Sequence, residues 1–210
     1  NELLADKARV GPGARVLDAG CGVGGSSIWL ARERGAACTG ITLDPGQVEM
    51  ARRFATERGV TGVTFEVMDF SQTTFAPASF DVVWNIESLC HSSDARNYLR
   101  HVFDLLDDGG RFACMDFFRG SGGNPADCEA MCDGWVLPDL QSMEAVASML
   151  SEVGFESVET LDVRARVMPS AEMLRSGGLW WSVMYKLEAA AGNARGPMGG
   201  KHFVAAVGAG

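Results

Sequence analysis

The sequence lacks any long apolar run, because no stretch approaches the roughly 20 residues that a membrane-spanning helix needs. It also lacks an excess of basic residues: 18 Lys and Arg stand against 27 Asp and Glu, a formal net charge of −9. That charge opposes binding to nucleic-acid phosphates and to anionic lipid, so we expect neither partner. With 47% hydrophobic residues, the chain is nevertheless too apolar to be disordered. We therefore expect a soluble, globular protein.

Cysteines are few and are not grouped as in a small disulfide scaffold. The six are Cys21, Cys38, Cys90, Cys114, Cys128 and Cys132. No signal peptide is evident, so we expect reduced thiols and a cytoplasmic location. Cys128 and Cys132 stand four apart, as two ligands on one helix face could, but no further ligand has suitable spacing. Buried thiols are the expectation, and no metal site is predicted.

Apolar runs of strand length alternate with segments of helical periodicity. The predicted strands are Arg15–Ala19, Ala37–Leu43, Thr64–Met68, Phe80–Ile86, Gly110–Phe118, Glu156–Val163 and His202–Val207. The clearest predicted helices are Ser93–Leu106, Ser142–Val153 and one that begins at Asp44-Pro45, where an acceptor precedes a proline of the first turn. Such alternation implies right-handed βαβ units and a parallel sheet covered on both faces. We therefore predict a doubly wound α/β fold.

The 210 residues give room for a single domain over 1–210. Regular alternation stops over about 119–140 and 164–201, and we interpret these stretches as helical lid insertions that could roof a pocket. Little sequence precedes Arg15, so N-terminal lid helices are expected to be missing. Ligands of doubly wound sheets bind beyond the carboxyl ends of the strands, so the turns after each strand are where function is expected.

A glycine-rich turn follows the first predicted strand. Gly20, Gly22 and Gly25 spell the G-x-G-x-x-G dinucleotide fingerprint, in which glycines let the backbone approach a ligand at a helix N-terminus. Asp18, two residues before Gly20, is poorly placed beside a pyrophosphate, because both carry negative charge. Its carboxylate suits a cationic ligand such as a sulfonium with a free amino group. The alternative is that Asp18 only caps a tight turn.

At this point the segment Val16–Gly22 resembles the first motif of the class I S-adenosylmethionine-dependent methyltransferases. The resemblance extends from about Val16 to the last predicted strand. It implies a Rossmann-like sheet of seven strands, the last one antiparallel, with S-adenosylmethionine as the cofactor. It also implies that the methionine part of the cofactor is held by Asp18, Gly20, Cys21 and Gly22.

The turn after the second predicted strand departs from the commonest pattern of this family. Thr42 stands where many members carry an acidic residue that binds the ribose hydroxyls. This departure resembles the branch that contains tocopherol, sterol, sugar and cyclopropane-forming methyltransferases, and it implies a ribose site lined by Thr42, Leu43 and Gln47. Asp44 is interpreted as a helix N-cap rather than as a ligand of the ribose.

Asp69 follows the third predicted strand, where the family's acidic residue accepts a hydrogen bond from the adenine amino group. By that likeness Met68 and Phe70 flank the adenine ring. The alternative for Asp69 is a loop aspartate that caps whatever follows it.

The strand Phe80–Ile86 opens into polar residues at its carboxyl end, and we predict the reaction site there. Methyl transfer from a sulfonium is an in-line displacement, so a base is needed only if the acceptor loses a proton. Glu87 is similar to the glutamate of terpenoid and tocopherol C-methyltransferases. His91, with Asp116, resembles the proposed base pair of sugar O-methyltransferases. The alternatives are that His91 caps the next helix and that Glu87 holds a backbone turn; Asn85 is assigned to the cofactor site.

The hypothesis that follows is a small-molecule methyltransferase with a hydrophobic natural-product or isoprenoid-like acceptor. Large, soft apolar side chains in the insertions favour such an acceptor. They are Met131, Trp135, Met168, Trp180, Trp181 and Met184. Carbon, oxygen and nitrogen acceptors stay open, as does the oligomeric state, with a homodimer among the alternatives. The rival functions are an NAD-dependent oxidoreductase and a non-catalytic cofactor-binding or partner-binding module.

Overall fold

The computed structural model of the chain describes residues 1–120, 122 and 124–166. These residues form two compact units. The first consists of Asn1–Phe117 and Val146–Val158, and the described part of the second consists of 118–120, 122, 124–145 and 159–166. The predicted strand His202–Val207 and most of the insertion 164–201 lie outside the described residues.

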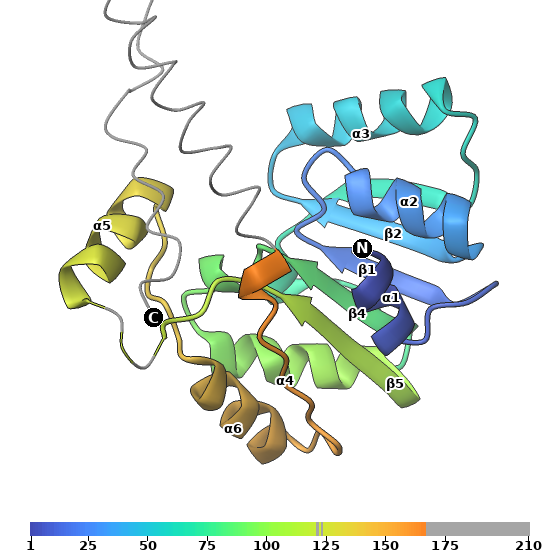
Figure 1. Cartoon of the computed structure of the whole chain (residues 1–210). Helices are drawn as coiled ribbons and strands as arrows, with labels where there is room; N and C mark the ends of the chain where they lie inside the picture. The colour runs from blue at the N-terminus through green and yellow to red at the C-terminus, as the bar shows by residue number, and fades with distance from the viewer. Residues whose placement is uncertain (121, 123, 167–210) are drawn as a thin grey trace, which may run out of the picture. The chain divides into compact units, whose positions relative to one another are not determined.

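The first unit is built on five parallel strands in the order β3-β2-β1-β4-β5 (Figure 1). They are β1 (Arg15–Ala19), β2 (Ala37–Thr42), β3 (Val63–Val67), β4 (Phe80–Ile86) and β5 (Leu106–Met115). Val16 of β1 pairs with Cys38 of β2 on one side and with Val82 of β4 on the other. The strand order therefore reverses between β1 and β4, and ligands of doubly wound sheets bind at the carboxyl ends beside such a reversal.

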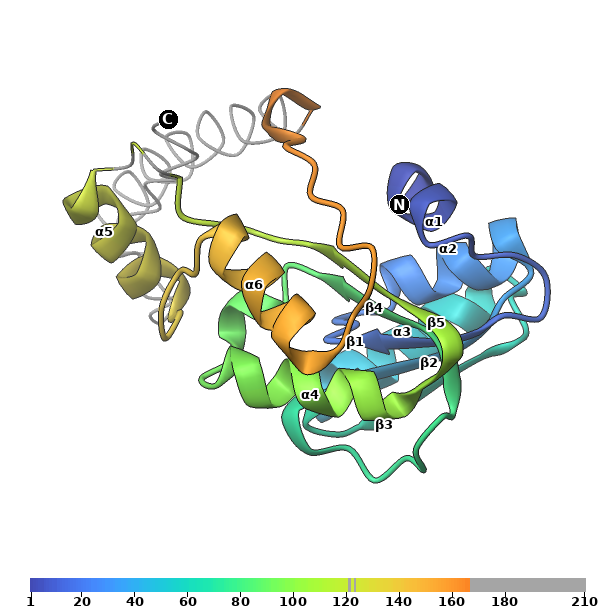
Figure 2. The same ribbon diagram turned by 90° about the horizontal axis from the view of Figure 1, so that it is seen from below.

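Helices of the first unit cover both faces of this sheet. The helices of the described residues are α1 (Glu2–Lys7), α2 (Gly25–Arg34), α3 (Pro45–Glu57), α4 (Ala95–Leu105), α5 (Pro125–Trp135) and α6 (Met143–Val153), and α5 belongs to the second unit. Helices α2 and α3 lie on one face, and α4 lies on the other, where Figure 2 shows it in front of the sheet. On the α2 face, Trp84 packs with Val16 and Leu30 in a core cluster. None of the helices in the described ranges is long and apolar enough to cross a membrane.

The sequence predicts the central elements closely. The bounds of β1 and β4 are those predicted, and β2 and β3 agree to within one residue at each end. The predicted helix Ser93–Leu106 is present as α4, which buries Tyr98, Leu99 and Val102, whereas Phe103 is exposed. Short helix α1 was not predicted, although its Ala5 is fully buried in the core of the first unit.

Two predicted strands need correction. Residues 156–163 form no strand. The side chains in this segment are exposed or only half-buried, so its apolar residues, Val158, Leu161 and Val163, form no buried face of a sheet.

Strand β5 begins at Leu106, directly after α4, rather than at Gly110. Leu106 pairs with Phe80 and Arg111 pairs with Val82, so the four residues 107–110 of β5 stand opposite the single residue Asp81 of β4, and the ladder is irregular there. The strand also ends at Met115, three residues before the predicted end.

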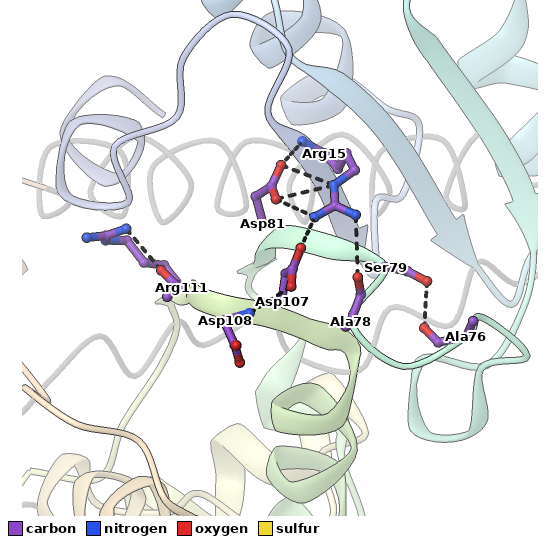
Figure 3. Close-up of polar contacts among 9 residues, drawn as sticks. Arg15, Ala76, Ala78, Ser79, Asp81, Asp107, Asp108 and Arg111 are labelled. Atoms are coloured by element: carbon purple, nitrogen blue, oxygen red, sulfur yellow. Dashed lines mark hydrogen bonds and ion pairs between the residues drawn. The ribbon is translucent and has the colours of Figure 1, made fainter.

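An ion-pair network joins the amino ends of β1, β4 and β5 (Figure 3). The Arg15 guanidinium donates to Asp81 at 2.6 Å and to Asp107 at 2.7 Å, and the backbone N–H of Arg15 donates to Asp81 at 2.7 Å. These hydrogen bonds hold the pKa values of both carboxyls below their usual range. Because the three side chains are partly exposed and screened by solvent, these ion pairs contribute little to stability. The network lies at the end of the sheet opposite to the predicted site.

The described part of the second unit contains α5, which falls in the predicted insertion over 119–140. Asn124 caps α5 by accepting a hydrogen bond from the backbone N–H of Ala126 at 3.1 Å, and Pro125 follows at the first helical position. Arg119 and Ser142 form an isolated parallel bridge. Cys128 and Cys132 lie on α5, and among the described residues no three or more His, Cys, Asp or Glu side chains are grouped as metal ligands.

Candidate functional site

The turn from β1 to α2 needs glycine at three positions. Gly20, Gly22 and Gly24 have φ values of +91°, +54° and +79°, which side chains with a Cβ rarely adopt. A Cβ on Gly20 would lie 2.5 Å from the Cβ of Ser88, and one on Gly24 would lie 2.6 Å from the Phe65 ring. The turn therefore passes directly against the loop after β4 and against β3.

Gly25, the third glycine of the dinucleotide fingerprint, is not constrained in this way. A Cβ at Gly25 would meet nothing within 4 Å. In dinucleotide-binding folds the third glycine is required for close packing of the helix on the strand, and here that close approach is made at Gly24 instead. The turn therefore departs from the dinucleotide fingerprint that the sequence spells.

Asp18 lies at the carboxyl end of β1 and is only 2% exposed. The Ser27 hydroxyl of α2 donates to its Oδ2 at 2.5 Å. Burial raises the pKa of Asp18 to about 6, and the hydrogen bonds from the hydroxyl and backbone of Ser27 act in the opposite direction. An ionised carboxylate has about four acceptor positions, so these contacts leave capacity for a cationic ligand. The expected cap role and a ligand role are thus compatible.

The turn after β2 carries a polar pair and one exposed apolar side chain. Thr42 Oγ1 donates to Gln47 Oε1 at 2.7 Å, and Leu43 beside them is 67% exposed. Asp44 Oδ1 accepts from the backbone N–H groups of Gly46 at 2.7 Å and Gln47 at 3.4 Å. The interpretation of Asp44 as the N-cap of α3 is confirmed.

The loop after β3 places Asp69 at the surface and Phe70 half-buried. Asp69 Oδ1 accepts from the backbone N–H of Ser71 at 2.8 Å and so caps a short 3₁₀ turn, as the alternative for this residue predicted. The Phe70 ring meets the Tyr98 ring edge to face, with centroids 4.8 Å apart. The backbone N–H of Met68 donates to the carbonyl of Thr42 at 3.0 Å, which joins this loop to the turn after β2.

Asn85 is the second-last residue of β4, and its fully buried side chain lies next to Ala19, the residue before the glycine turn. Its Nδ2 donates to the Ala19 carbonyl at 3.1 Å and to Ser88 Oγ at 2.7 Å, and Ser88 Oγ donates to the same carbonyl at 2.7 Å. Tyr98 of α4 donates its hydroxyl hydrogen to Asn85 Oδ1 at 2.7 Å. The side chain of Asn85 therefore joins the end of β1, the loop after β4 and helix α4.

Glu87 lies exposed at the tip of the turn after β4. Its φ of +52° is unusual for a residue with a side chain, and its backbone N–H donates to the carbonyl of Met115 at 2.9 Å. Partial burial of the carboxyl, and then the nearby charge of Asp116, raise the pKa of Glu87 above its usual range. A carboxylate shifted in this direction is a stronger base than an ordinary glutamate.

Asp116 and His91 are not joined as predicted. Asp116 Oδ2 accepts from the backbone N–H groups of Ser88 at 3.0 Å and Cys90 at 3.1 Å, and its Oδ1 accepts from Phe117 N–H at 2.8 Å. The exposed His91 ring makes no hydrogen bond within the described ranges. Asp116 thus holds the turn that carries Glu87 and His91 rather than contacting His91 itself.

The cap of α4 settles the alternative for His91. Asp94 Oδ1 accepts from the backbone N–H of Asn97 at 3.0 Å and is the N-cap. His91 instead ends the short 3₁₀ turn Leu89–His91, so the expectation that it caps the helix is wrong.

Comparison with known proteins identifies the family. The model of a methyltransferase domain matches residues 17–114. A probable chloroplastic tocopherol O-methyltransferase of Oryza sativa is 30% identical over 82% of this chain and 50% of its own length. An O-methyltransferase of Aspergillus nomiae is 32% identical over 72% of this chain and 68% of its own length. The chain belongs to the class I S-adenosylmethionine-dependent methyltransferases.

The solved structure of geranyl diphosphate methyltransferase with GPP and sinefungin superposes with a TM-score of 0.76 at 25% identity. It covers 83% of this chain and 64% of that chain. The chain spans between about half and two thirds of the lengths of the curated relatives it matches.

Short sequence motifs mark the loops of the candidate site but not the residues that support them. Ser27, Ser88 and Tyr98 are the side chains that hold Asp18, the Ala19 carbonyl and Asn85. For Tyr98 the sequence signal is a hydroxyl among the otherwise apolar buried residues of α4.

The titration of Asp18 predicts opposite effects of pH on folding and on ligand binding. Its pKa is 3.8 without the fold and about 6 in the folded protein, so the folded state binds more protons between these values. The contribution of this group to the stability of the ligand-free protein therefore falls as pH rises from about 4 to 6, by on the order of 2 kcal/mol. Cys21 and Cys38 are also near Asp18, but burial raises their pKa values to about 12, so they stay neutral.

Affinity for a ligand with an ammonium group runs the other way, because it needs the ionised carboxylate. Below pH 6 we expect the affinity for S-adenosylhomocysteine to fall by up to about tenfold per pH unit. Urea unfolding and calorimetry from pH 4.5 to 8, each compared with Asp18→Asn, isolate this group from the other carboxyls. Parallel pH profiles for the two proteins would contradict the prediction.

Proposed function

We propose that this chain transfers a methyl group from S-adenosylmethionine to a small-molecule acceptor. The observation that carries the proposal is the buried Asp18 carboxylate beside a glycine turn at the point where strand order reverses. A fixed negative charge at that edge favours the sulfonium and ammonium of S-adenosylmethionine over a pyrophosphate. Family membership supports the same cofactor.

Three loops of the first unit are proposed to hold the three parts of the cofactor. The methionine part lies on the glycine turn, and the ribose and adenine lie on the turns after β2 and β3. Exposure of Leu43 beside the Thr42–Gln47 pair supports the ribose assignment, because a ligand would cover that apolar surface. The proposed contacts are Asp18, Gly20, Cys21, Gly22, Thr42, Leu43, Gln47, Met68, Asp69 and Phe70. Asn85 is proposed to hold the glycine turn through its hydrogen bond to the Ala19 carbonyl.

The proposed chemistry is an in-line displacement at the cofactor's methyl carbon. The acceptor's electron pair forms the new bond as the carbon–sulfur bond breaks, and S-adenosylhomocysteine leaves as a neutral thioether. Alignment supplies most of the acceleration, because the sulfonium is already an activated leaving group. Glu87 is the proposed base for an acceptor that loses a proton, with His91 as the second candidate on the same turn.

The proposed acceptor is hydrophobic and resembles a natural product or an isoprenoid. The rice relative is named for tocopherol, and the superposed structure contains GPP. The content of Met and Trp in the sequence of the two insertions supports an apolar acceptor. Carbon and oxygen remain the two proposed acceptor atoms.

Calorimetric titration with S-adenosylhomocysteine, run beside reduced nicotinamide dinucleotide, tests the cofactor assignment. We expect micromolar binding of the first ligand alone. Transfer of labelled methyl from S-adenosylmethionine to a panel of prenyl diphosphates, phenols and polyketides then tests the activity. Binding of the dinucleotide alone would favour an oxidoreductase, and S-adenosylhomocysteine binding with no transfer to any acceptor would favour a non-catalytic module.

A further inference from the structure

Tyr98 touches two functional loops from the interior of the first unit. It lies on α4, and its side chain is 2% exposed. Its hydroxyl donates to Asn85 Oδ1 at 2.7 Å, and its ring meets Phe70 edge to face at 4.8 Å. Asn85 lies near the end of β4 and donates to Ser88 of the loop after it, and Phe70 belongs to the loop after β3, so one side chain links both loops.

The hydrogen bonds beyond Asn85 run in one direction only. The Ala19 carbonyl can only accept, so the Asn85 amide must turn Nδ2 toward it, at 3.1 Å. This orientation turns Oδ1 toward Tyr98, which must donate. Ser88 Oγ accepts from Asn85 Nδ2 and donates to the Ala19 carbonyl at 2.7 Å. The chain of donors therefore ends on the residue directly before the glycine turn.

Core packing alone does not explain a tyrosine at this position. The other buried residues of α4 are Leu99, Val102 and Leu105, all apolar. A phenylalanine would fill the same space, and a buried hydroxyl lowers stability unless it is paired. Burial raises the pKa of Tyr98 well above its usual range, so the hydroxyl stays protonated and remains a donor. The hydroxyl thus serves Asn85 rather than the packing of the helix.

We propose that Tyr98 is a positioning residue for both halves of the cofactor. Through Asn85 and Ser88, its hydroxyl sets the position of the Ala19–Gly20 backbone that receives the methionine half. Through Phe70, its ring sets the wall beside the adenine. The inference rests on the proposed function, because it assigns the two loops to the two halves of S-adenosylmethionine.

Two ligands separate the halves. S-adenosylhomocysteine carries the amino acid part, whereas methylthioadenosine carries only the adenine, the ribose and the sulfur. In Tyr98→Phe we expect calorimetry to show about tenfold weaker binding of S-adenosylhomocysteine and unchanged binding of methylthioadenosine, because Asn85 Oδ1 loses its donor. In Tyr98→Leu, which also removes the ring, both ligands should bind more weakly.

Leu99→Ala is the matched control, because Leu99 is fully buried on the same helix and its side chain has no polar atom that could join the hydrogen-bond network. It should lower the unfolding temperature more than Tyr98→Phe does and leave the affinities for both ligands unchanged. Ser88→Ala provides a second route into the network and should reproduce the selective loss. Combined with Tyr98→Phe, it should give less than the sum of the two losses, because Asn85 and Ser88 are hydrogen-bonded to each other and both donate to the Ala19 carbonyl.

Equal weakening of the two ligands in Tyr98→Phe, or the same selective loss in Leu99→Ala, would overturn the inference. Additive losses in the double variant would overturn the route through Asn85. If the unaltered chain binds neither ligand, the proposed function fails first and the inference falls with it. If the unaltered chain binds both and Tyr98→Phe binds both equally well, only the inference fails.

Discussion

Replacement of Asp18 by asparagine is expected to weaken S-adenosylhomocysteine binding on the order of 100-fold, because the ligand's ammonium loses a buried ionic partner. Asparagine has nearly the same shape, and its amide oxygen can still accept the hydrogen bond from Ser27. In the unaltered protein this bond joins Ser27 Oγ and Asp18 Oδ2 at 2.5 Å. The change therefore removes charge while it keeps the local packing. Calorimetry at pH 7.5, where the carboxylate of the unaltered protein is ionised, measures the difference.

Asp81→Asn is the matched control at the other end of the sheet. Asp81 binds Arg15 at the amino end of β4, so its loss should lower stability slightly and leave the ligand affinity unchanged. Asp18→Asn, in contrast, should stabilise the ligand-free protein at neutral pH, because it removes a buried charge whose pKa is raised. An affinity equal to that of the unaltered protein would separate the glycine turn from cofactor binding and withdraw the assignment of Asp18.

Sequence patterns predict an element well when it is buried on both faces or when its neighbours in space are also close in sequence. Strands β1 and β4 are mostly apolar and mostly buried, as central parallel strands are, and both have the predicted bounds. The segment 156–163 has three apolar residues within the length of a strand, but a strand also needs a partner, and composition alone does not reveal one. The irregular ladder at Asp107–Gly110 depends on pairing with β4, so its sequence is equally compatible with a helix end.

In the candidate site, the residues that are contiguous in sequence are predicted, and those that come from distant segments are not. The turn from Asp18 to Gly22 is contiguous in sequence, and its residues lie together at the end of β1. Ser27 and Tyr98 reach the site from helices on opposite faces of the sheet, so their roles follow from packing that no short motif encodes. Gly24 is similar, because its requirement for glycine comes from Phe65 on β3 as well as from its φ of +79°.

Asp116 illustrates how a correct location can carry a different role. The sequence places it after β5 and pairs it with His91 by resemblance. In the structure its two oxygens accept three backbone N–H groups, and Ser88 and Cys90 are two of the donors. A carboxylate occupied in this way orients a turn and is poorly available to polarise an imidazole. It also contributes the negative charge that helps to raise the pKa of Glu87.

Glu87→Gln is expected to lower the turnover number by about 10²- to 10⁴-fold for an acceptor that loses a proton, the range typical of a lost general base. The raised pKa of Glu87 and its exposed place at the tip of the turn both favour this role. Glutamine preserves the size of the side chain and does not alter the backbone at φ +52°. Affinity for S-adenosylhomocysteine should stay within about twofold, since the proposed cofactor contacts are intact.

His91→Ala is the companion variant on the same turn, and it separates the two proposed chemistries. A larger loss in Glu87→Gln indicates that the carboxylate takes the proton or stabilises a cation in attack by carbon. A larger loss in His91→Ala indicates proton removal from a hydroxyl by the imidazole, without help from Asp116. Single-turnover transfer of labelled methyl measures both variants at saturating cofactor. Wild-type rates in both would show that alignment alone drives the reaction, and neither residue would then keep its assignment as a base.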